Sequence, residues 1–326
     1  MNNIRVGVIG LGKMGTYHVN LCKEINEVEL AAVSDIDKHK IDSFNNASQV
    51  ESFVDYRNAL PFVDAVIIAT PTELHYEIAK CCLNNNKHVL VEKPITTNLK
   101  MAEELFDIAE RKKLILNIGH IERFNGAVLE LRKIINKPYL IESRRVGPFE
   151  IKNSNNSIVL DLLIHDIDIV MNIVKHNVVL IEATGSSVYS NIADIAVVHI
   201  VFENSTVANM LVSRVTQKKE RTLSISQEDA YILLDYTNQD INIYRKGQSM
   251  HIYGEKELKY MNEYTLERLF VYKENPLKQE IKYFIDCING EECRNVTVDH
   301  ELMSLKLALE IDNIIKNNSV RAKVFI

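Results

Sequence analysis

The sequence predicts a two-domain α/β protein, in which a doubly wound parallel sheet is followed by an α+β domain with a large, mostly antiparallel open sheet. Its 326 residues are enough for two domains with separate cores. Up to about residue 120, short apolar runs alternate with helical patterns, as expected for parallel strands covered on both faces. Beyond that point, strand-like stretches follow one another without helices between them, which is typical of antiparallel sheets. We therefore expect domains at residues 1–120 and 121–326.

In the first domain, β-branched runs bounded by turn residues predict the strands, and longer amphipathic patterns predict the helices between them. The expected strands are Ile4–Ile9, Val28–Ser34, Ala65–Ala69, His88–Val91 and Leu114–Ile118. The expected helices are Lys13–Ile25, Glu73–Asn84 and Leu99–Arg111.

In the second domain, helices are expected near its two ends and strands between them, with hairpin-turn chemistry at residues 203–205 and a polar loop at Asn153–Ser157. The expected helices are Gly126–Ile135, Leu160–Val174, Pro276–Ile288 and Asp299–Asn317. The expected strands are Tyr139–Val146, Val178–Thr184, Ile195–Phe202, Thr206–Val212, Thr222–Ser226, Tyr231–Asp235, Ile241–Tyr244 and Val320–Ile326.

Composition and charge argue against several classes of protein. A formal charge of −6 argues against a general nucleic-acid binder, which carries a basic excess. The sequence lacks a run of about 18 apolar residues and a charged leader, so we expect no membrane span and a cytoplasmic protein. Five cysteines without CxxC spacing favour reduced thiols over a disulfide framework.

A glycine motif of the form GxGxxG follows the first expected strand directly. Gly10 would allow the tight turn, Gly12 the close approach of a pyrophosphate, and Gly15 close packing of helix on strand. The helix beginning near Lys13 and Met14 would point its free amides at the phosphates. This arrangement predicts a dinucleotide-binding Rossmann domain.

The acid that ends the second expected strand bears on the choice of cofactor. Asp35 stands 20 residues after Gly15, where a carboxylate binds the adenosine ribose 2′-hydroxyl. A carboxylate would repel a 2′-phosphate, and Lys38 is the nearest cation. We therefore favour NAD over NADP.

Two more segments follow strands at the same sheet edge. One is an Ala-Thr-Pro-Thr turn, in which Thr72 is either a cofactor contact, a helix N-cap or both. The other is a Glu-Lys-Pro sequence. The cofactor contacts expected from these segments are Thr70, Pro71, Thr72, His75, Glu92, Lys93 and Pro94.

The glycine motif, the Ala-Thr-Pro turn and the Glu-Lys-Pro sequence together resemble the glucose–fructose oxidoreductase / inositol dehydrogenase (Gfo/Idh/MocA) family, over essentially the whole chain. That family also carries an Asp-x-x-x-His pair, matched here by Asp161 and His165. The resemblance implies that Lys93, Asp161 and His165 are catalytic. Leu163 stands where many relatives have glycine, which puts the shape of the pocket in doubt.

These residue types suit the oxidation of a secondary alcohol. A histidine titrates in the range of a general base near neutral pH, and an aspartate can orient its ring. A lysine can stabilise the developing alkoxide, while a nicotinamide accepts the hydride. The bland alternatives are a solvated lysine and a structural histidine.

Substrate contacts are expected after the last strand of the first domain and at the end of the next strand. His120, Arg123 and Asn125 are candidates, although this segment is equally typical of an interdomain hinge. Arg144 and Arg145 either bind a diphosphate or form a solvated strand face. The motifs that contain these residues resemble the branch of UDP-N-acetylglucosamine 3-dehydrogenases, which implies oxidation of a sugar 3-hydroxyl.

Three other possibilities remain at this stage. Asp161, His165, Asp168 and His120 also suit a metal, but the absence of a tight Cys/His cluster favours none. Some relatives use NAD within a glycosidase cycle, and a non-catalytic dinucleotide-binding regulator would keep the same fold. The apolar strands of the second domain predict a homodimer or homotetramer formed through its sheet, against a monomer as the alternative.

Overall fold

The computed structural model describes residues 3–45, 50–151, 155–253, 258–292, 296–318 and 320–321. The chain forms two compact units. The first consists of Met1–Phe124 and Glu274–Leu309, and the second of Asn125–Lys273 and Glu310–Ile326. The first segment of the first unit ends at Phe124, whereas a boundary at residue 120 was expected. The first unit also contains a late segment that the sequence pattern had assigned to the second domain.

The first unit contains a six-stranded parallel sheet in the order β3-β2-β1-β4-β5-β6, the doubly wound arrangement expected. The strands are β1 Ile4–Ile9, β2 Val28–Ser34, β3 Glu51–Phe53, β4 Ala65–Ile68, β5 His88–Glu92 and β6 Leu116–Gly119. The helices are α1 Lys13–Cys22, α2 Lys38–Asn45, α3 Thr72–Asn84, α4 Leu99–Lys112 and α7 Pro276–Asn289, with short 3-10 helices η1 Tyr56–Asn58, η2 Leu60–Phe62 and η3 Ile121–Phe124. Helix α8, Val298–Asn318, begins in this unit and ends in the second.

Each face of the parallel sheet has its own apolar cluster, because alternate strand residues point to opposite faces. Val8 belongs to one cluster and its neighbour Ile9 to the other. Helix α7 places Ile281 and Phe284 in the cluster that contains Val8. This burial explains why the late segment Glu274–Leu309 groups with the first unit.

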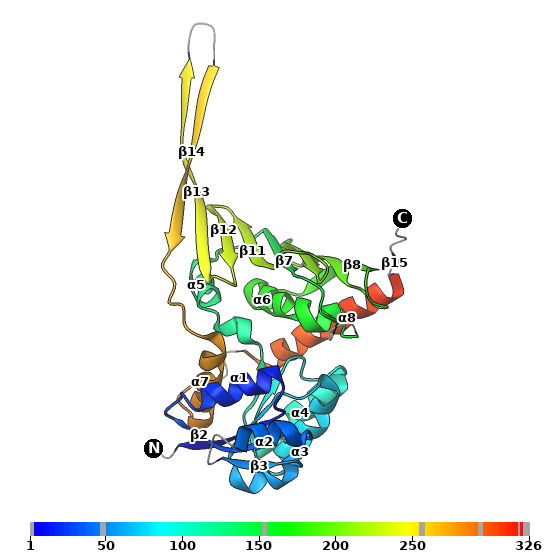
Figure 1. The fold of residues 1–326 in the computed structure, drawn as a ribbon. Helices are drawn as coiled ribbons and strands as arrows, with labels where there is room; N and C mark the ends of the chain where they lie inside the picture. The colour runs from blue at the N-terminus through cyan, green and yellow to red at the C-terminus, as the bar shows by residue number, and fades with distance from the viewer. Residues whose placement is uncertain are drawn as a thin grey trace. The chain divides into compact units, whose positions relative to one another are not determined.

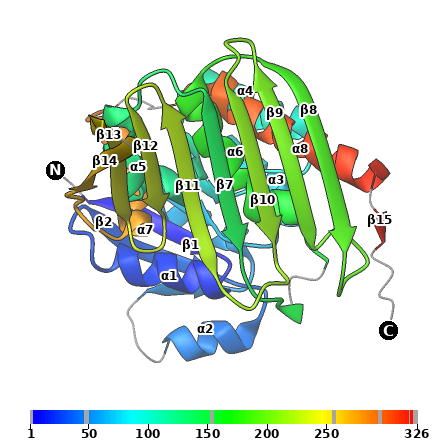
Figure 2. The same cartoon turned by 90° about the horizontal axis from the view of Figure 1, so that it is seen from above.

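The second unit contains a nine-stranded sheet in the order β14-β13-β12-β11-β7-β10-β9-β8-β15 (Figure 2). Only the β10–β7 and β15–β8 pairs are parallel among the described strands, so the sheet is mostly antiparallel, as expected. The strands are β7 Leu140–Val146, β8 Val178–Ser187, β9 Ile195–Phe202, β10 Val207–Ser213, β11 Glu220–Gln227, β12 Ala230–Asp235, β13 Asp240–Tyr253, β14 Leu258–Leu269 and β15 Val320–Arg321. The helices are α5 Gly126–Ile134 and α6 Ile164–Val174, and α6 is preceded by a π-helical turn at Val159–Leu163.

The β13–β14 hairpin is longer than the sequence pattern predicts and extends past the rest of its sheet (Figure 1). Strand β12 pairs with β13 only as far as Tyr244, and beyond it the two hairpin strands pair with each other. The prediction stopped at Tyr244 because the polar residues that follow lack the alternation of a half-buried strand.

Two other predictions reach beyond the described residues. Of the expected strand Val320–Ile326, the described part is β15, and residues 322–326 lie outside it. In the expected polar loop Asn153–Ser157, residues 153 and 154 also lie outside the described residues.

Candidate active site

The glycine turn lies between the end of β1 and the start of α1. Gly10 has φ +94°, and a Cβ there would approach the carbonyl oxygen of Ala69 to 2.7 Å. A Cβ at Gly15 would collide with the carbonyl oxygen of Gly10, whereas a Cβ at Gly12 would meet no heavy atom of the described residues within 4 Å. The turn is thus closed on the protein side and open above Gly12, in front of the first amides of α1. This open cradle fits a dinucleotide pyrophosphate.

Asp35 follows β2 at the same edge and is held by hydrogen bonds. Its Oδ2 accepts from the Leu11 amide at 2.7 Å and from Lys40 Nζ at 3.1 Å, and its Oδ1 accepts from the Asp37 amide at 2.8 Å. Burial raises the pKa of this carboxyl, but the hydrogen bonds from Asp37, Leu11 and Lys40 together lower it by more. The pKa of Asp35 therefore lies below its usual value. Asp35 is therefore an anion at neutral pH.

His75, in the first turn of α3, joins two segments of the expected cofactor site. Its ring nitrogens lie 2.9 Å from the carbonyl oxygens of Thr70 and Pro94. The ring is buried, so His75 holds these two segments together. The hydroxyl of Thr70 is also buried and has no hydrogen-bond partner among the described residues, which fits a site that a polar ligand completes.

Lys93 directly follows β5 and is half-buried. The preceding residue, Glu92, accepts a hydrogen bond at 2.8 Å from Nε2 of His18, a buried residue of α1. The helix that begins at the glycine turn is thereby linked to the strand end that carries Lys93.

Asp161 and His165 belong to the second unit, and both are half-buried. Asp161 lies in the π-helical turn and His165 in the first turn of α6. Asp168 is buried, so it differs from the other two in exposure although the three were expected on one helical face. The sequence predicted a continuous helix here; the π turn is a feature that often occurs at functional sites.

The expected substrate residues that follow β6 are buried in polar contacts. Arg123 donates two hydrogen bonds, of 2.6 and 2.9 Å, to Glu301 of α8. His120 Nε2 lies 3.9 Å from the same carboxylate. Asn125 caps α5 by accepting from the Ala127 amide at 3.1 Å. These contacts favour a structural role, which was the alternative weighed for this segment.

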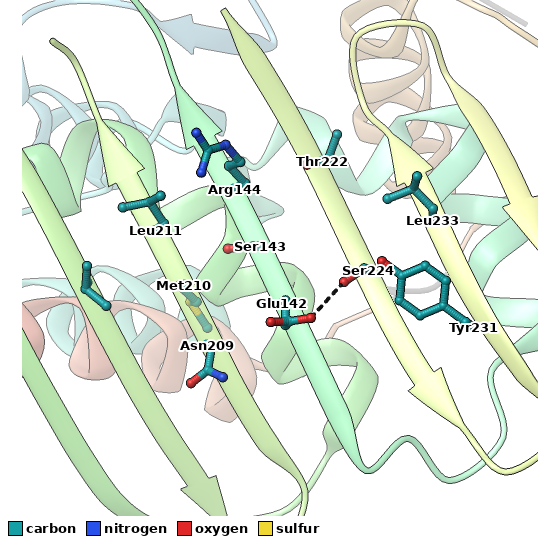
Figure 3. A pocket seen from close by; sticks show the side chains of 11 residues that line it. Glu142, Ser143, Arg144, Asn209, Met210, Leu211, Thr222, Ser224, Tyr231 and Leu233 are labelled. Carbon is teal, nitrogen blue, oxygen red and sulfur yellow. Dashed lines mark hydrogen bonds between the residues drawn. The ribbon is translucent and has the colours of Figure 1, made fainter. Parts of the chain in front are cut away.

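The two neighbouring arginines of β7 point to opposite faces of the sheet, because strand side chains alternate. Arg145 is buried and donates two hydrogen bonds, of 2.7 and 3.1 Å, to Asp166 of α6. Arg144 stands on the other face, in the hollow that Figure 3 shows, with its Nε 3.3 Å from a carboxylate oxygen of Glu220. With their side chains on opposite faces, Arg144 and Arg145 are not placed to bind one diphosphate together.

Sequence reasoning missed two groups near Glu92. One is His18, and the other is Glu280 on α7, whose buried carboxyl has no hydrogen-bond partner among the described residues. A signal was available, since Glu280 interrupts an apolar face formed by Leu277, Ile281 and Phe284.

Three further properties of the described residues concern possible metal ligands, membrane-spanning helices and cysteines. No three His, Cys, Asp or Glu side chains there are grouped to hold a metal ion. No described helix is both long and apolar enough to cross a bilayer. Cys22, Cys81 and Cys82 are free thiols, and Cys293 lies outside the described residues.

Family models and curated relatives match most of the chain. Residues 4–120 match the model described as oxidoreductase family, NAD-binding Rossmann fold, and residues 126–257 match the GFO/IDH/MocA C-terminal domain. UDP-N-acetylglucosamine 3-dehydrogenase from Acidithiobacillus ferrooxidans is 32% identical over 248 residues, which cover 76% of this chain and 79% of that protein. Myo-inositol 2-dehydrogenase from Thermotoga maritima is 31% identical over 56% of this chain and 58% of that protein.

Solved structures agree with this assignment. A structure of the Acidithiobacillus ferrooxidans UDP-N-acetylglucosamine 3-dehydrogenase has a TM-score of 0.88 at 28% identity, over 97% of this chain and 99% of that one. Scyllo-inositol dehydrogenase from Lactobacillus casei, with bound NAD(H) and scyllo-inositol, has a TM-score of 0.79 at 19% identity, over 98% of each chain, and shows the shared fold. The chain belongs to the Gfo/Idh/MocA family of oxidoreductases.

Proposed function

We propose that this protein is an NAD-dependent dehydrogenase that oxidises a secondary hydroxyl of a nucleotide sugar, the 3-hydroxyl of UDP-N-acetylglucosamine. The observation that carries the proposal is the edge of the parallel sheet. There the open cradle at Gly12, the anionic Asp35 and the half-buried Lys93 follow three different strands of one unit. Ligands bind at this edge in doubly wound sheets.

The residues of the first unit would bind the cofactor and the reacting oxygen. The amides at the start of α1 face the pyrophosphate, and Asp35 accepts a hydrogen bond from the adenosine ribose. The Lys93 ammonium donates to the substrate oxygen and stabilises the negative charge that develops on it. A bound nicotinamide supplies the acceptor for the hydride.

The residues of the second unit would handle the proton. His165 removes the hydroxyl proton as a general base, and Asp161 stabilises the resulting imidazolium. The overall change is a secondary alcohol and NAD giving a ketone, NADH and one proton, so atoms and charge balance.

The identity of the sugar rests on the relatives. The Acidithiobacillus ferrooxidans protein is named for UDP-N-acetylglucosamine and matches this chain in sequence and over nearly its whole structure. The choice of NAD rests on Asp35, because an anion there disfavours the 2′-phosphate of NADP.

We further propose that the open face of the second unit's sheet pairs with another copy of the chain. Val197, Leu211, Tyr231 and Leu233 line the hollow on that face, which Figure 3 shows from close by. In Figure 2 no described element of this unit lies over that face. Substituting Val197 and Tyr231 with aspartate should therefore shift the oligomer toward monomer in sedimentation velocity. A monomeric wild-type protein would contradict this.

A substrate panel tests the activity. The protein is incubated with NAD or NADP and with UDP-N-acetylglucosamine, its uronic acid, myo-inositol or a simple aldose, with hydroxylamine present to trap any ketone. We expect NADH absorbance to rise with UDP-N-acetylglucosamine, and a trapped product that carries its oxime at C3. Cleavage of a glycosidic bond without net NADH would support the glycosidase alternative, and NAD binding without any turnover would support a regulator.

Two variants test the roles of the site residues. Lys93→Met and His165→Asn should each bind NADH as the wild type does and lose about 10²–10⁴-fold in kcat, as expected for lost acid–base or electrostatic catalysis. Lys133→Met, at an exposed lysine of α5, is the matched control and should keep full activity. Full activity in the Lys93 or His165 variant would refute its assignment.

A further inference from the structure

A cluster of polar residues, all buried except the half-buried Glu92, lies in the first unit at the point where β5 ends. It comprises His18 of α1, Glu92 of β5, His120, Arg123 of η3, Glu280 of α7 and Glu301 of α8. Helix α7, which carries the buried Glu280, packs against both α1 and η3. Five segments that are distant in sequence therefore contribute to one buried cluster beside Lys93.

Two of the three carboxyl groups of this polar cluster accept hydrogen bonds from side chains of the cluster, and the third does not. Glu92 accepts from His18 at 2.8 Å, and Glu301 accepts from Arg123 at 2.6 and 2.9 Å. Glu280 is only 2% exposed, and neither of its oxygens has a hydrogen-bond partner within the described part of the chain. A buried carboxylate without a partner costs several kcal/mol, so such a group stays protonated instead.

The surroundings of Glu280 agree with this reasoning. Burial raises its pKa well above the usual value, and the charges on Glu92 and then Glu301 raise it further, against the opposing charge of Arg123. His18 and His120 are the other titratable groups that the neighbouring segments contribute to the cluster. With Glu280 uncharged, Glu92 faces no competing anion for His18.

We propose that Glu280 is a positioning residue for Lys93: buried in the polar cluster that contains Glu92, it keeps Glu92 bonded to His18 and thereby fixes the strand end that carries Lys93. This inference rests on the proposed function only in giving Lys93 a catalytic role. A charged Glu280 would repel Glu92, and an empty position would let Glu92 move away from His18. In either case Lys93 would lose its support.

Glu280→Gln and Glu280→Ala separate positioning from simple packing, because glutamine copies the shape of the uncharged acid. With a nucleotide sugar as substrate, Glu280→Ala should lose at least about 10-fold in kcat with NADH affinity unchanged, since small displacements of a catalytic group cost 10²-fold. Glu280→Gln should restore kcat. Ile285→Ala, at a fully buried apolar residue of the same helix, is the control: it should lower thermal stability and leave kcat unchanged.

A second readout needs no turnover. The reactivity of the Lys93 amine is measured by competitive acetylation and mass spectrometry, with exposed Lys133 as internal reference. We expect Glu280→Ala to change the labelling of Lys93, and Glu280→Gln and Ile285→Ala to leave it unchanged. If no sugar is oxidised, the proposed function fails while this labelling still decides the inference.

Melting curves test the uncharged state. An acid whose pKa is raised by folding loses stability as pH rises above its unfolded value, and glutamine abolishes that loss. The Tm of Glu280→Gln should therefore exceed that of the wild type at pH 8 by at least roughly 2–4 °C, and the difference should shrink toward pH 4.5. Wild-type labelling and kcat in Glu280→Ala, a Glu280→Gln variant as impaired as Glu280→Ala, or a Tm difference that does not depend on pH would each overturn the proposal.

Discussion

Asp194 of the second unit and Glu280 of the first are both buried carboxyl groups, but their surroundings act on them in opposite ways. In the second unit, Asp194 is fully buried and accepts hydrogen bonds from the amides of residues 188, 189 and 190, from Ser190 Oγ and from Arg214 Nε. Burial raises the pKa of Asp194, but these bonds outweigh it and hold the pKa far below its usual range. Glu280 in the first unit has no such bonds, and its pKa is shifted upward.

Asp194 is thus a structural carboxylate, whereas the burial of Glu280 costs the fold free energy. Asp194 closes the turn between β8 and β9, and its charge is compensated by donors on every side. The charge on Glu92, the residue that precedes Lys93, acts on Glu280, and no hydrogen bond from the described residues compensates the Glu280 carboxyl. Buried groups with shifted titration concentrate at functional sites, so the second pattern points to function and the first to stability.

The largest effect is expected from removing the compensated carboxylate. Asp194→Ala removes the carboxylate that lies 2.8 Å from buried Arg214 and should lose about 3–5 kcal/mol in the free energy of unfolding, measured with urea. Because folding lowers the pKa of Asp194, its contribution is present above the unfolded pKa and disappears as pH falls. The wild type should therefore lose its advantage over the variant in acid. The exposed carboxylate variant Asp229→Ala is the control, and a loss below about 1 kcal/mol in Asp194→Ala would erase the contrast.

A double substitution tests whether Arg145 and Asp166 stabilise the second unit through their contact with each other. Arg145→Met and Asp166→Leu should each lose about 3–5 kcal/mol, because each removes one member of a buried ion pair. Together they should lose much less than the sum, since the apolar pair needs no donors. Additive losses in a urea double-mutant cycle would show that the two residues act independently.

In the first unit, the contacts of the His75 ring should affect the affinity for the cofactor. His75→Ala removes the contacts to the Thr70 and Pro94 carbonyls and should weaken NADH binding by roughly 1–3 kcal/mol, the cost of unsatisfied buried groups, as followed by NADH fluorescence. Substituting the exposed His176 of the second unit should change nothing. Unchanged affinity in the His75 variant would show that these two segments are held by other contacts.

The smallest effect is expected on the open face of the sheet. Arg144→Ala breaks a half-exposed ion pair with Glu220 and should change the free energy of unfolding by no more than about 1 kcal/mol. Since Arg144 and Arg145 point to opposite faces, kcat and KM for the sugar should stay at wild-type values. A large rise in KM would restore Arg144 as a substrate contact.

Regular elements could be read from the sequence because their patterns are local. Strands β1 and β2 match their expected bounds, since each is a run of β-branched and apolar residues. The short edge strand β3 was missed because it has only three residues, and α2 because its sequence is largely polar. The π turn before α6 was missed because its hydrogen bonds are not encoded by a hydrophobic period.

The sequence by itself determined the parallel and antiparallel sheets, the glycine turn and the acid at the end of β2, because turn geometry and strand periodicity act over a few residues. Tertiary structure decided that α7 returns to the first unit, that Arg144 and Arg145 separate, and that Glu280 meets Glu92. These outcomes depend on which surfaces bury one another across as many as 254 residues of chain, and a local pattern contains no record of that choice.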